Sequence, residues 1–356
     1  MAKTRVIGLD IGTTAVRAAE VEFDGGPGAA RRGAPGRVVR AGTMPLPWGA
    51  VHDGEVAEPA TVSSAIKRLW SDRKFGSKEV VVGVGNQRVM VREFDMPQMP
   101  PAQLRAALPF QVEGLLPVAA GDALLDFHPV STSVGAEGPM VHGLLVAATA
   151  ETVLANTRAV ELAGLRPVMV DLNAFAVARL QARSGFGSGV RAFVDIGARV
   201  TNVSIVVDGM PRFVRILPAG GHDVTEALTG ALDVPAAEAE VIKRRVGVGL
   251  ASAPEDLTAK QIIAEVVTGM VDSIRNTLVY YASSNPGGGV EQIVLSGGGS
   301  FLPGLGQYLA SATRVAVAVG EPLQTFPLAK NLNPQSLGGE PSTYAVPLGL
   351  AMGVAA

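Results

Sequence analysis

The sequence contains no cysteine among its 356 residues, which excludes both a disulfide framework and a thiolate metal site. The formal net charge is only −2, so electrostatics gives no reason to expect nucleic acid as a partner. No apolar run reaches the ~18 residues that a membrane-spanning helix needs. The amino terminus leads directly into the first predicted strand, which leaves no room for a signal peptide. We therefore expect a cytoplasmic protein.

Histidine is also scarce. The four histidines do not have ligand spacing, so we expect no metal role for His52, His128, His142 or His222. Apolar residues, in contrast, make up 47% of the chain, which is ample for two large lobes with separate cores.

The stretch from Val6 to Val21 predicts a strand, a tight turn and a returning strand, V-I-G-L-D-I-G-T-T-A-V-R-A-A-E-V. Gly12 lets the backbone come close to a ligand, Thr13 and Thr14 add hydroxyl donors, and consecutive turn N–H groups can form a concave anion site. Asp10 would repel a bare phosphate, so its expected role is to hold Mg²⁺ through the metal's waters. Taken alone, the string is more typical of an ordinary β-turn.

A second hairpin of the same type begins at Phe193, with the sequence F-V-D-I-G-A-R-V-T-N-V-S-I-V. Its Asp195 and Gly197 occupy the places of Asp10 and Gly12. One such hairpin in each half of the chain predicts a duplicated architecture in which two phosphate-binding turns face each other across a cleft.

A third string follows a predicted buried strand over 293–296 and consists of three glycines, Gly297, Gly298 and Gly299. A turn of this composition leaves room for a flat ring to lie on the backbone. The acid-plus-glycine hairpin, its repeat and the strand ending in three glycines, in that order, resemble the nucleotide site of the actin, DnaK-type chaperone and hexokinase superfamily.

The pattern of apolar residues and breakers indicates two large lobes and an inserted small α+β subdomain, and the resemblance to this superfamily implies an α/β, two-lobed actin-like fold. The first lobe covers 1–82 and 166–189, and the insert covers 83–165. The second lobe covers 190–340, with a helical subdomain at about 226–289, and a helix within 341–356 packs on the first lobe. Inside the insert we expect a hairpin from Asn86 to Met96 and a helix from Pro100 to Leu116.

Two patterns in the second lobe leave alternatives open. Asp223 or Thr225 is a candidate cap for a helix that follows the second hairpin. Glu240 and Lys243 lie one helical turn apart, a spacing that lets both reach one ligand or simply form a surface ion pair.

The sequence as a whole resembles the type IV pilus assembly protein PilM family, actin-like relatives of the cell-division protein FtsA. The resemblance spans nearly the whole chain. It rests on both hairpins and on three further strings, F-V-R-I-L-P-A-G-G-H-D-V-T, A-E-V-I-K and L-S-G-G-G-S-F-L-P-G-L. It implies ATP with Mg²⁺ in the cleft between two lobes. It also implies that the short cytoplasmic amino-terminal segment of the inner-membrane protein PilN binds beside the insert, so that membrane contact is indirect, and it leaves self-association open.

The resemblance also implies a role for each residue of the site. Phosphate would be held by Gly12, Thr13 and Thr14, with Gly197 and Ala198 in the second turn. Asp10 and Asp195 would flank the metal. The ribose and adenine side would be contacted by Glu240 and Lys243, and the adenosine would be lined by Gly297, Gly298 and Gly299.

Two departures from the superfamily pattern predict slow hydrolysis. Ala198, Arg199 and Val200 form a bulkier second turn than the consecutive glycines and threonines of the chaperones. Where those relatives place an acid that orients the attacking water, this chain has Leu172, with Asp171 beside it. A missing base removes the ~10²–10⁴-fold that general base catalysis contributes. We therefore expect a nucleotide-gated scaffold, and keep as alternatives an FtsA-like filament protein and a small-molecule kinase of the same superfamily.

Overall fold

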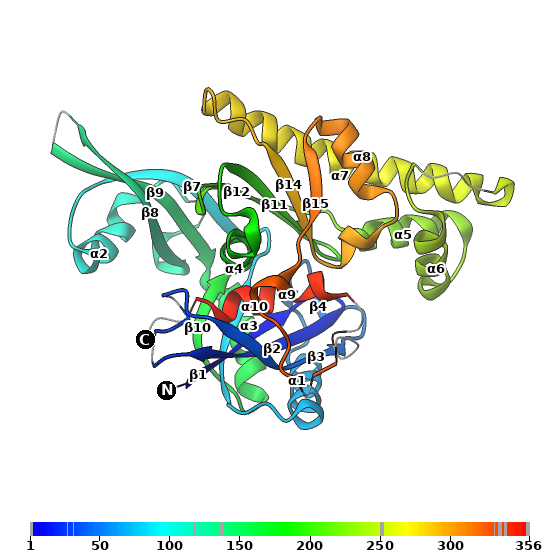
Figure 1. Ribbon diagram of the computed structural model, residues 1–356, viewed down its shortest axis with the longest axis horizontal. Helices are drawn as coiled ribbons and strands as arrows, with labels where there is room; N and C mark the ends of the chain where they lie inside the picture. Colours follow the sequence, from blue (N-terminus) through cyan, green and yellow to red (C-terminus); the bar gives the residue numbers. More distant parts are fainter. Residues whose placement is uncertain are drawn as a thin grey trace.

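The computed structural model describes residues 3–26, 28–30, 32–116, 118–135, 138–249, 253–330, 332–333, 337 and 340–353. Two five-stranded sheets form the centres of two lobes, and a three-stranded sheet projects to one side as an arm (Figure 1). This is the two-lobed α/β architecture with an insert that the sequence predicts.

The first-lobe sheet has the order β10-β6-β1-β2-β3, in which β1, β2 and β3 are antiparallel and β6 and β10 run parallel to β1. The strands are β1 (Lys3–Ile11), β2 (Ala15–Asp24), β3 (Gly36–Pro45), β6 (Glu79–Val84) and β10 (Arg166–Leu172). Central strands that are buried on both faces need continuous apolar runs, which explains why Val80, Val81 and Val82 are all fully buried.

The second-lobe sheet repeats this order strand for strand, as β15-β14-β11-β12-β13. Its strands are β11 (Val190–Ile196), β12 (Thr201–Val207), β13 (Met210–Leu217), β14 (Gln292–Ser296) and β15 (Ala316–Val319). In both sheets an antiparallel meander of three strands is extended by two parallel strands. The duplication that the paired hairpins suggest therefore extends to the whole sheet.

Helices cover both faces of the first-lobe sheet. One face packs against α1 (Pro59–Arg73) and α3 (Ala150–Leu162), next to the short strands β4 (Val51–His52) and β5 (Glu55–Val56). The other face packs against α4 (Asn173–Gln181) and α10 (Ala345–Ala351). Because strand side chains alternate, Ile7 and Leu9 join the first core and Val6 joins the second.

The helix α10 makes an unusually close contact with the first lobe. A Cβ added at Gly8 or at Gly349 would lie 2.0 Å from the carbonyl oxygen of Pro347 or Ala176, respectively. Glycine at both positions therefore allows the helix to touch strand β1 and helix α4. Residues 354–356 of the predicted carboxyl-terminal segment lie outside the described residues.

The second lobe carries most of the remaining helices. These are α5 (Gly221–Leu232), α6 (Ala236–Val246), α7 (Leu257–Ser284), α8 (Leu305–Thr313) and α9 (Pro322–Thr325). Single turns of other helix types occur at Ala120–Asp122, Ala182–Phe186, Pro254–Asp256, Gly298–Phe301 and Pro341–Tyr344. Among the described residues, no helix combines the length and the apolar character that crossing a membrane requires.

The arm is an antiparallel sheet of β7 (Val89–Pro97), β9 (Gly138–Thr149) and β8 (Ala123–Gly135), covered by α2 (Pro101–Gln111). The hairpin predicted from Asn86 to Met96 is wrong, because that segment is a single strand that pairs with β9. The predicted helix to Leu116 ends at Gln111 instead, two residues after Pro109, whose ring cannot continue the helical hydrogen-bond ladder.

Candidate functional site

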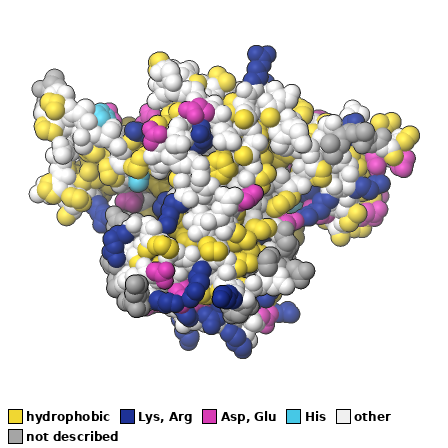
Figure 2. Space-filling view, in the orientation of Figure 1, with side chains coloured by type: hydrophobic (Ala, Val, Ile, Leu, Met, Phe, Trp, Pro, Cys, Tyr) yellow, Lys and Arg dark blue, Asp and Glu magenta, His cyan; other side chains and the backbone are white. Residues whose placement is uncertain are grey.

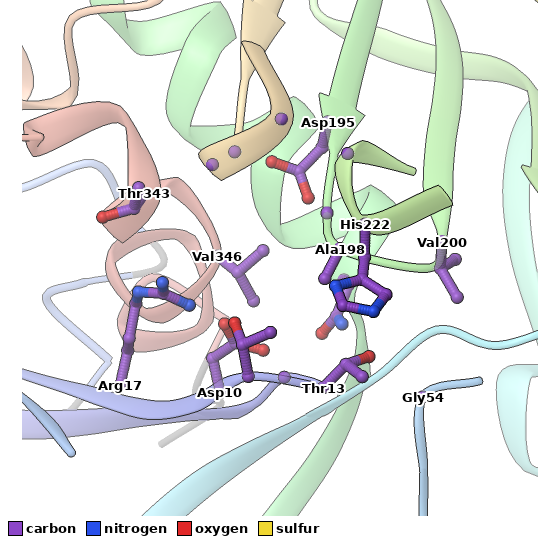
Figure 3. Close-up of a pocket in the computed structure, with 18 of the residues that line it drawn as sticks. Asp10, Thr13, Arg17, Gly54, Asp195, Ala198, Val200, His222, Thr343 and Val346 are labelled. Carbon is purple, nitrogen blue, oxygen red and sulfur yellow. The ribbon is translucent and has the colours of Figure 1, made fainter. Parts of the chain in front are cut away.

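A cavity of about 480 Å³ lies between the lobes, and the turns of both hairpins open into it (Figure 3). All the site residues that the sequence predicts line this cavity: Asp10, Gly12, Thr13, Thr14, Asp195, Gly197, Ala198, Glu240, Lys243, Gly297, Gly298 and Gly299. The two duplicated sheets thus bring residues up to 289 positions apart in the sequence to one cavity.

The two hairpin turns are closed by the same hydrogen bond. The N–H of Gly12 donates to the carbonyl of Ala15 at 3.1 Å, and the N–H of Gly197 donates to the carbonyl of Val200 at 2.9 Å. A Cβ at Gly197 would lie 2.8 Å from that Val200 oxygen, so the second turn needs glycine for its shape. The bulkier side chains of the second turn have not changed its backbone hydrogen bond.

Two buried carboxylates enter the cavity from opposite lobes (Figure 3). Burial raises the pKa of Asp10 to about 6, Arg17 opposes this rise, and the charge of Asp195 adds to it. Burial also raises the pKa of Asp195, although the hydroxyl of Ser296 donates to its Oδ1 at 2.8 Å and counteracts the rise. A cation placed between the two groups would relieve the cost of holding both charges away from water.

Two asparagine residues that line the same cavity each have a side-chain oxygen without a hydrogen-bond partner. Asn173 begins α4, Asn202 is paired with Asp195 on the neighbouring strand, and the Oδ1 atom of each is buried and unpaired. Carboxylate and amide oxygens suit a hard cation. The described residues contain no group of three or more histidine, cysteine, aspartate or glutamate side chains able to hold a metal, so the ion would keep much of its water. The site fits a hydrated Mg²⁺.

Glu240 and Lys243 form an ion pair of 2.5 Å, which is one of the two alternatives left open by their spacing. Both residues also line the cavity, and their contact with a ligand stays a prediction. Lys243 is nearly buried, and its Nζ donates to the carbonyl of Gly221 and to the hydroxyl of Thr225, each at 2.9 Å. Burial opposes ionisation of Glu240, but hydrogen bonds from Lys243 and Arg244 outweigh it and lower the pKa of this carboxyl.

The three glycines after β14 lie directly on the second hairpin. Gly297 has a φ of +80°, and a Cβ there would lie 2.4 Å from the carbonyl oxygen of Ile196. A Cβ at Gly299 would lie 2.4 Å from Cγ2 of Ile196. Only glycine permits this approach, which leaves the backbone itself as the wall of the cavity.

Of the two candidate helix caps, Asp223 is confirmed and Thr225 is wrong. Helix α5 begins at Gly221 and its N-cap is Gly220, whose N–H donates to Oδ2 of Asp223 at 2.8 Å. Asp223 therefore caps from the third helical position, as in a capping box, and Thr225 lies inside the helix.

Sequence reasoning missed several residues that line the cavity, among them Arg17, Asn173, Asn202 and His222. Arg17 and Asn202 pair with Asp10 and Asp195 across their hairpins, so the strand register could have identified them. The signal for Asn173 is its place directly after a parallel strand, where sheets commonly present ligand-binding groups.

Two like lobes that close on a cavity lined by paired acid-and-glycine hairpins define an actin-like protein. A model of the family "Type IV pilus assembly protein PilM" matches residues 8–354, so the chain belongs to this family. The prediction from sequence is thereby confirmed: the chain is an actin-like pilus assembly protein, and neither of the two alternatives is favoured.

Solved structures and a curated relative agree with this assignment. The structure of the PilM–PilN type IV pilus biogenesis complex is 28% identical, with a TM-score of 0.84 and coverage of 98% of both chains. MreB5 of Spiroplasma citri bound to ADP is 14% identical, with a TM-score of 0.51, and covers 97% of this chain and 94% of that chain; it shows the fold alone. Cell division protein FtsA of Neisseria meningitidis serogroup B is 24% identical over 229 residues, 56% of this chain. The match covers 55% of FtsA, so the chain spans about half the length of this curated relative.

Proposed function

We propose that this protein is an ATP-binding scaffold of the type IV pilus machinery, with MgATP in the interlobe cavity. The observation that carries the proposal is the convergence of both hairpin turns, the three glycines and two buried carboxylates on one cavity of about 480 Å³. A cavity of this size falls within the ~300–1,000 Å³ of typical small-molecule sites.

The cavity has a phosphate end and a nucleoside end. At the phosphate end, Gly12, Thr13, Thr14, Gly197 and Ala198 supply backbone and hydroxyl groups. At the nucleoside end, Glu240 and Lys243 would contact the sugar, and the base would lie on Gly297, Gly298 and Gly299, all of which line the cavity.

Mg²⁺ would neutralise phosphate charge at the phosphate end of the cavity. Asp10 and Asp195 would hold its waters, and the unpaired oxygens of Asn173 and Asn202 would accept hydrogen bonds from those waters. A bound cation favours the ionised carboxylate, so it would lower the raised pKa of Asp10.

Calorimetry with the intact protein tests nucleotide binding. We expect heat for ATP with Mg²⁺, weaker binding when EDTA removes the ion, and little difference between the two conditions in an Asp10→Asn, Asp195→Asn double variant. Absence of heat from the intact protein, together with a cleft that stays empty after crystals are soaked in MgATP, would overturn the proposal.

The proposed partner is the short amino-terminal cytoplasmic segment of a PilN-type inner-membrane protein. The structure of a PilM–PilN complex resembles this chain over 98% of its length. We place the peptide between the first lobe and the insert at 83–164, where Figure 2 shows hydrophobic side chains over the arm formed by β8, β9 and α2. Large apolar side chains exposed on this arm are Phe110, Leu115, Leu124 and Val134. Apolar surface of this kind marks interaction sites, and such binding would make the protein's membrane attachment indirect.

Titration of a labelled PilN amino-terminal peptide tests this surface. A Phe110→Ser, Leu124→Ser double variant should bind more weakly, because those side chains are 79% and 50% exposed and contribute little to the core. Val241→Ser is the matched control, since Val241 is 65% exposed on α6 of the other lobe. Equal binding by the arm variant and the control would place the groove elsewhere.

A further inference from the structure

An aromatic stack joins the two lobes at the rim of the cavity. The rings of Trp48 and His222 lie with centroids 3.7 Å apart and an interplanar angle of 26°, and the guanidinium of Arg199 lies 5.2 Å from the Trp48 ring centroid. Trp48 follows β3 in the first lobe, whereas Arg199 and His222 belong to the second. The Trp48 side chain is 54% exposed, so its position depends on these contacts rather than on burial in a core.

Both sides of the stack are anchored to the phosphate turns. In the first lobe, the N–H of Leu46 donates to the carbonyl of Thr14 at 2.9 Å and ties the Trp48 loop to the first hairpin. In the second lobe, the N–H of His222 donates to the carbonyl of Ala198 at 2.8 Å. A change at either turn is therefore transmitted directly to the stacked rings.

His222 lines the cavity from the first turn of helix α5. Figure 3 shows its imidazole ring between Thr13 and Ala198, which belong to opposite phosphate turns. The backbone donors at the start of α5 are already used, because Gly221 and His222 donate to Gly197 and Ala198. Among the described residues, no hydrogen bond occupies the ring nitrogens of His222.

The surroundings of His222 favour its neutral form. Burial is the main cause that lowers the pKa of the imidazole, and Arg199 and Lys243 lower it further. The carboxylates of Glu226 and Asp223 act in the opposite direction without reversing the shift. A neutral imidazole has one N–H to donate, and the positive charges around it suit a neighbouring anion.

We propose that His222 donates a hydrogen bond to the terminal phosphate of bound ATP, and that Trp48 holds the imidazole there from the opposite lobe. This latch rests on the proposed nucleotide site and adds a means of distinguishing ATP from ADP. With ATP bound, the stack and the phosphate both fix the ring, which holds the lobes together. With ADP bound, the stack alone joins the lobes at this rim.

Calorimetry with MgATP and MgADP on a set of variants tests the donor. His222→Phe retains a ring for stacking but has no N–H, so ATP binding should weaken about tenfold, as expected for a hydrogen bond to a charged group. ADP binding should not change. Trp48→Leu should weaken ATP binding in the same direction, and Trp48→Phe should restore most of it. An unchanged ratio of ATP to ADP affinity in His222→Phe would overturn the latch.

A double variant separates positioning from packing. If Trp48 acts through His222, then Trp48→Leu combined with His222→Phe loses no more ATP affinity than His222→Phe alone. Additive losses would show that Trp48 does not position the imidazole. If the intact protein binds neither ATP nor ADP, the proposed function itself is wrong. If it binds both, and the variants leave the ratio of ATP to ADP affinity unaltered, only the latch is contradicted.

Fluorescence gives a second readout. The chain has two tryptophans, so Trp70→Phe leaves Trp48 as the only one. Its emission should change when MgATP is added and change much less with MgADP. Equal changes with both nucleotides would contradict the proposal.

Discussion

At Gly12, adding a side chain should strongly weaken ATP binding. A Cβ there would lie 3.2 Å from the carbonyl oxygen of Ala15, and the remaining atoms of a larger side chain would enter the cavity. We expect Gly12→Val to weaken ATP binding by more than about tenfold, or 1.4 kcal/mol, while the protein stays folded.

Gly289→Val is the matched control for this change. It lies in the loop before β14, and a Cβ there would meet no atom within 4 Å. Calorimetry should show parental ATP binding for Gly289→Val and unfolding by circular dichroism should occur at a similar temperature in both variants. Parental ATP affinity in Gly12→Val would contradict close approach of the phosphate to this turn.

The expected rate of ATP hydrolysis also depends on single residues. Leu172 has no basic group, and the carboxylate of Asp171 is engaged by Arg179 and by the N–H of Leu172, so neither residue supplies a base to the cavity. Asn173 lines the cavity, but an amide can orient a water without accepting its proton. We therefore expect turnover below the ~1–10³ s⁻¹ of most enzymes.

Steady-state phosphate release measures this expectation, and Asn173→Asp should raise the rate by placing a carboxylate at that position. A turnover within the usual range from the intact protein, with no partner added, would argue against a scaffold and for the kinase alternative.

The sequence predicted the acids and glycines of the site because each is marked by its own local string. It did not predict that His222 lines the cavity. The four histidines have no metal-ligand spacing, so no sequence pattern assigned His222 to a site. The contact between Trp48 and His222 joins residues 174 positions apart in different lobes, and no local pattern specifies such a pair.

Among the strands, β2 contains a carboxylate that makes part of the stability depend on pH. Hydrogen bonds from Lys3, Arg5 and Arg37 lower the pKa of Glu22 from 4.5 to about 2. Because the native pKa is the lower one, this contribution is complete above pH 4.5 and is lost as the pH falls towards 2.

Urea unfolding of the parent and of Glu22→Gln checks this pH dependence. The variant should be less stable at pH 7, and the difference between the two proteins should shrink at pH 3. Glu161→Gln, at an exposed position on α3, should resemble the parent at both pH values. A difference between the parent and Glu22→Gln that is the same at both pH values would exclude the ionised carboxylate as its source.

Strands were predicted correctly where the strand they pair with is close in the sequence. The strands β1 and β2 are joined by a short turn, as are β11 and β12, so each pair could be predicted from one string. Strand β7 was assigned to a hairpin in error because its partner β9 follows only after α2 and β8. Pairing across an intervening helix and strand depends on the tertiary fold, which the local pattern does not contain.

The molecule as a whole should couple its two proposed sites. The cavity proposed for the nucleotide is lined by both lobes, while the proposed peptide surface lies on the arm beside the first lobe. If ATP favours the closed arrangement of the lobes and the peptide prefers one arrangement, each ligand changes the other's affinity by the same factor.

Titrating the labelled PilN peptide with and without MgATP measures this factor. The Gly12→Val variant should show no effect of ATP and should retain the basal peptide affinity. Identical peptide affinities in the parent protein with and without ATP would show that the two sites are independent.

The close packing of α10 on β1 and α4 has a consequence for synthesis on the ribosome. The first-lobe core contains Val6 and Ala19 together with Ala345, Leu348 and Leu350, so one face of the sheet stays incompletely covered until residue 351 has left the exit tunnel. The second lobe, in contrast, has a core drawn from residues 190–317 and can form earlier. The lobe that is synthesised first is therefore the last to finish folding, and during that interval its exposed strands are open to chaperones and to misassociation with other nascent chains.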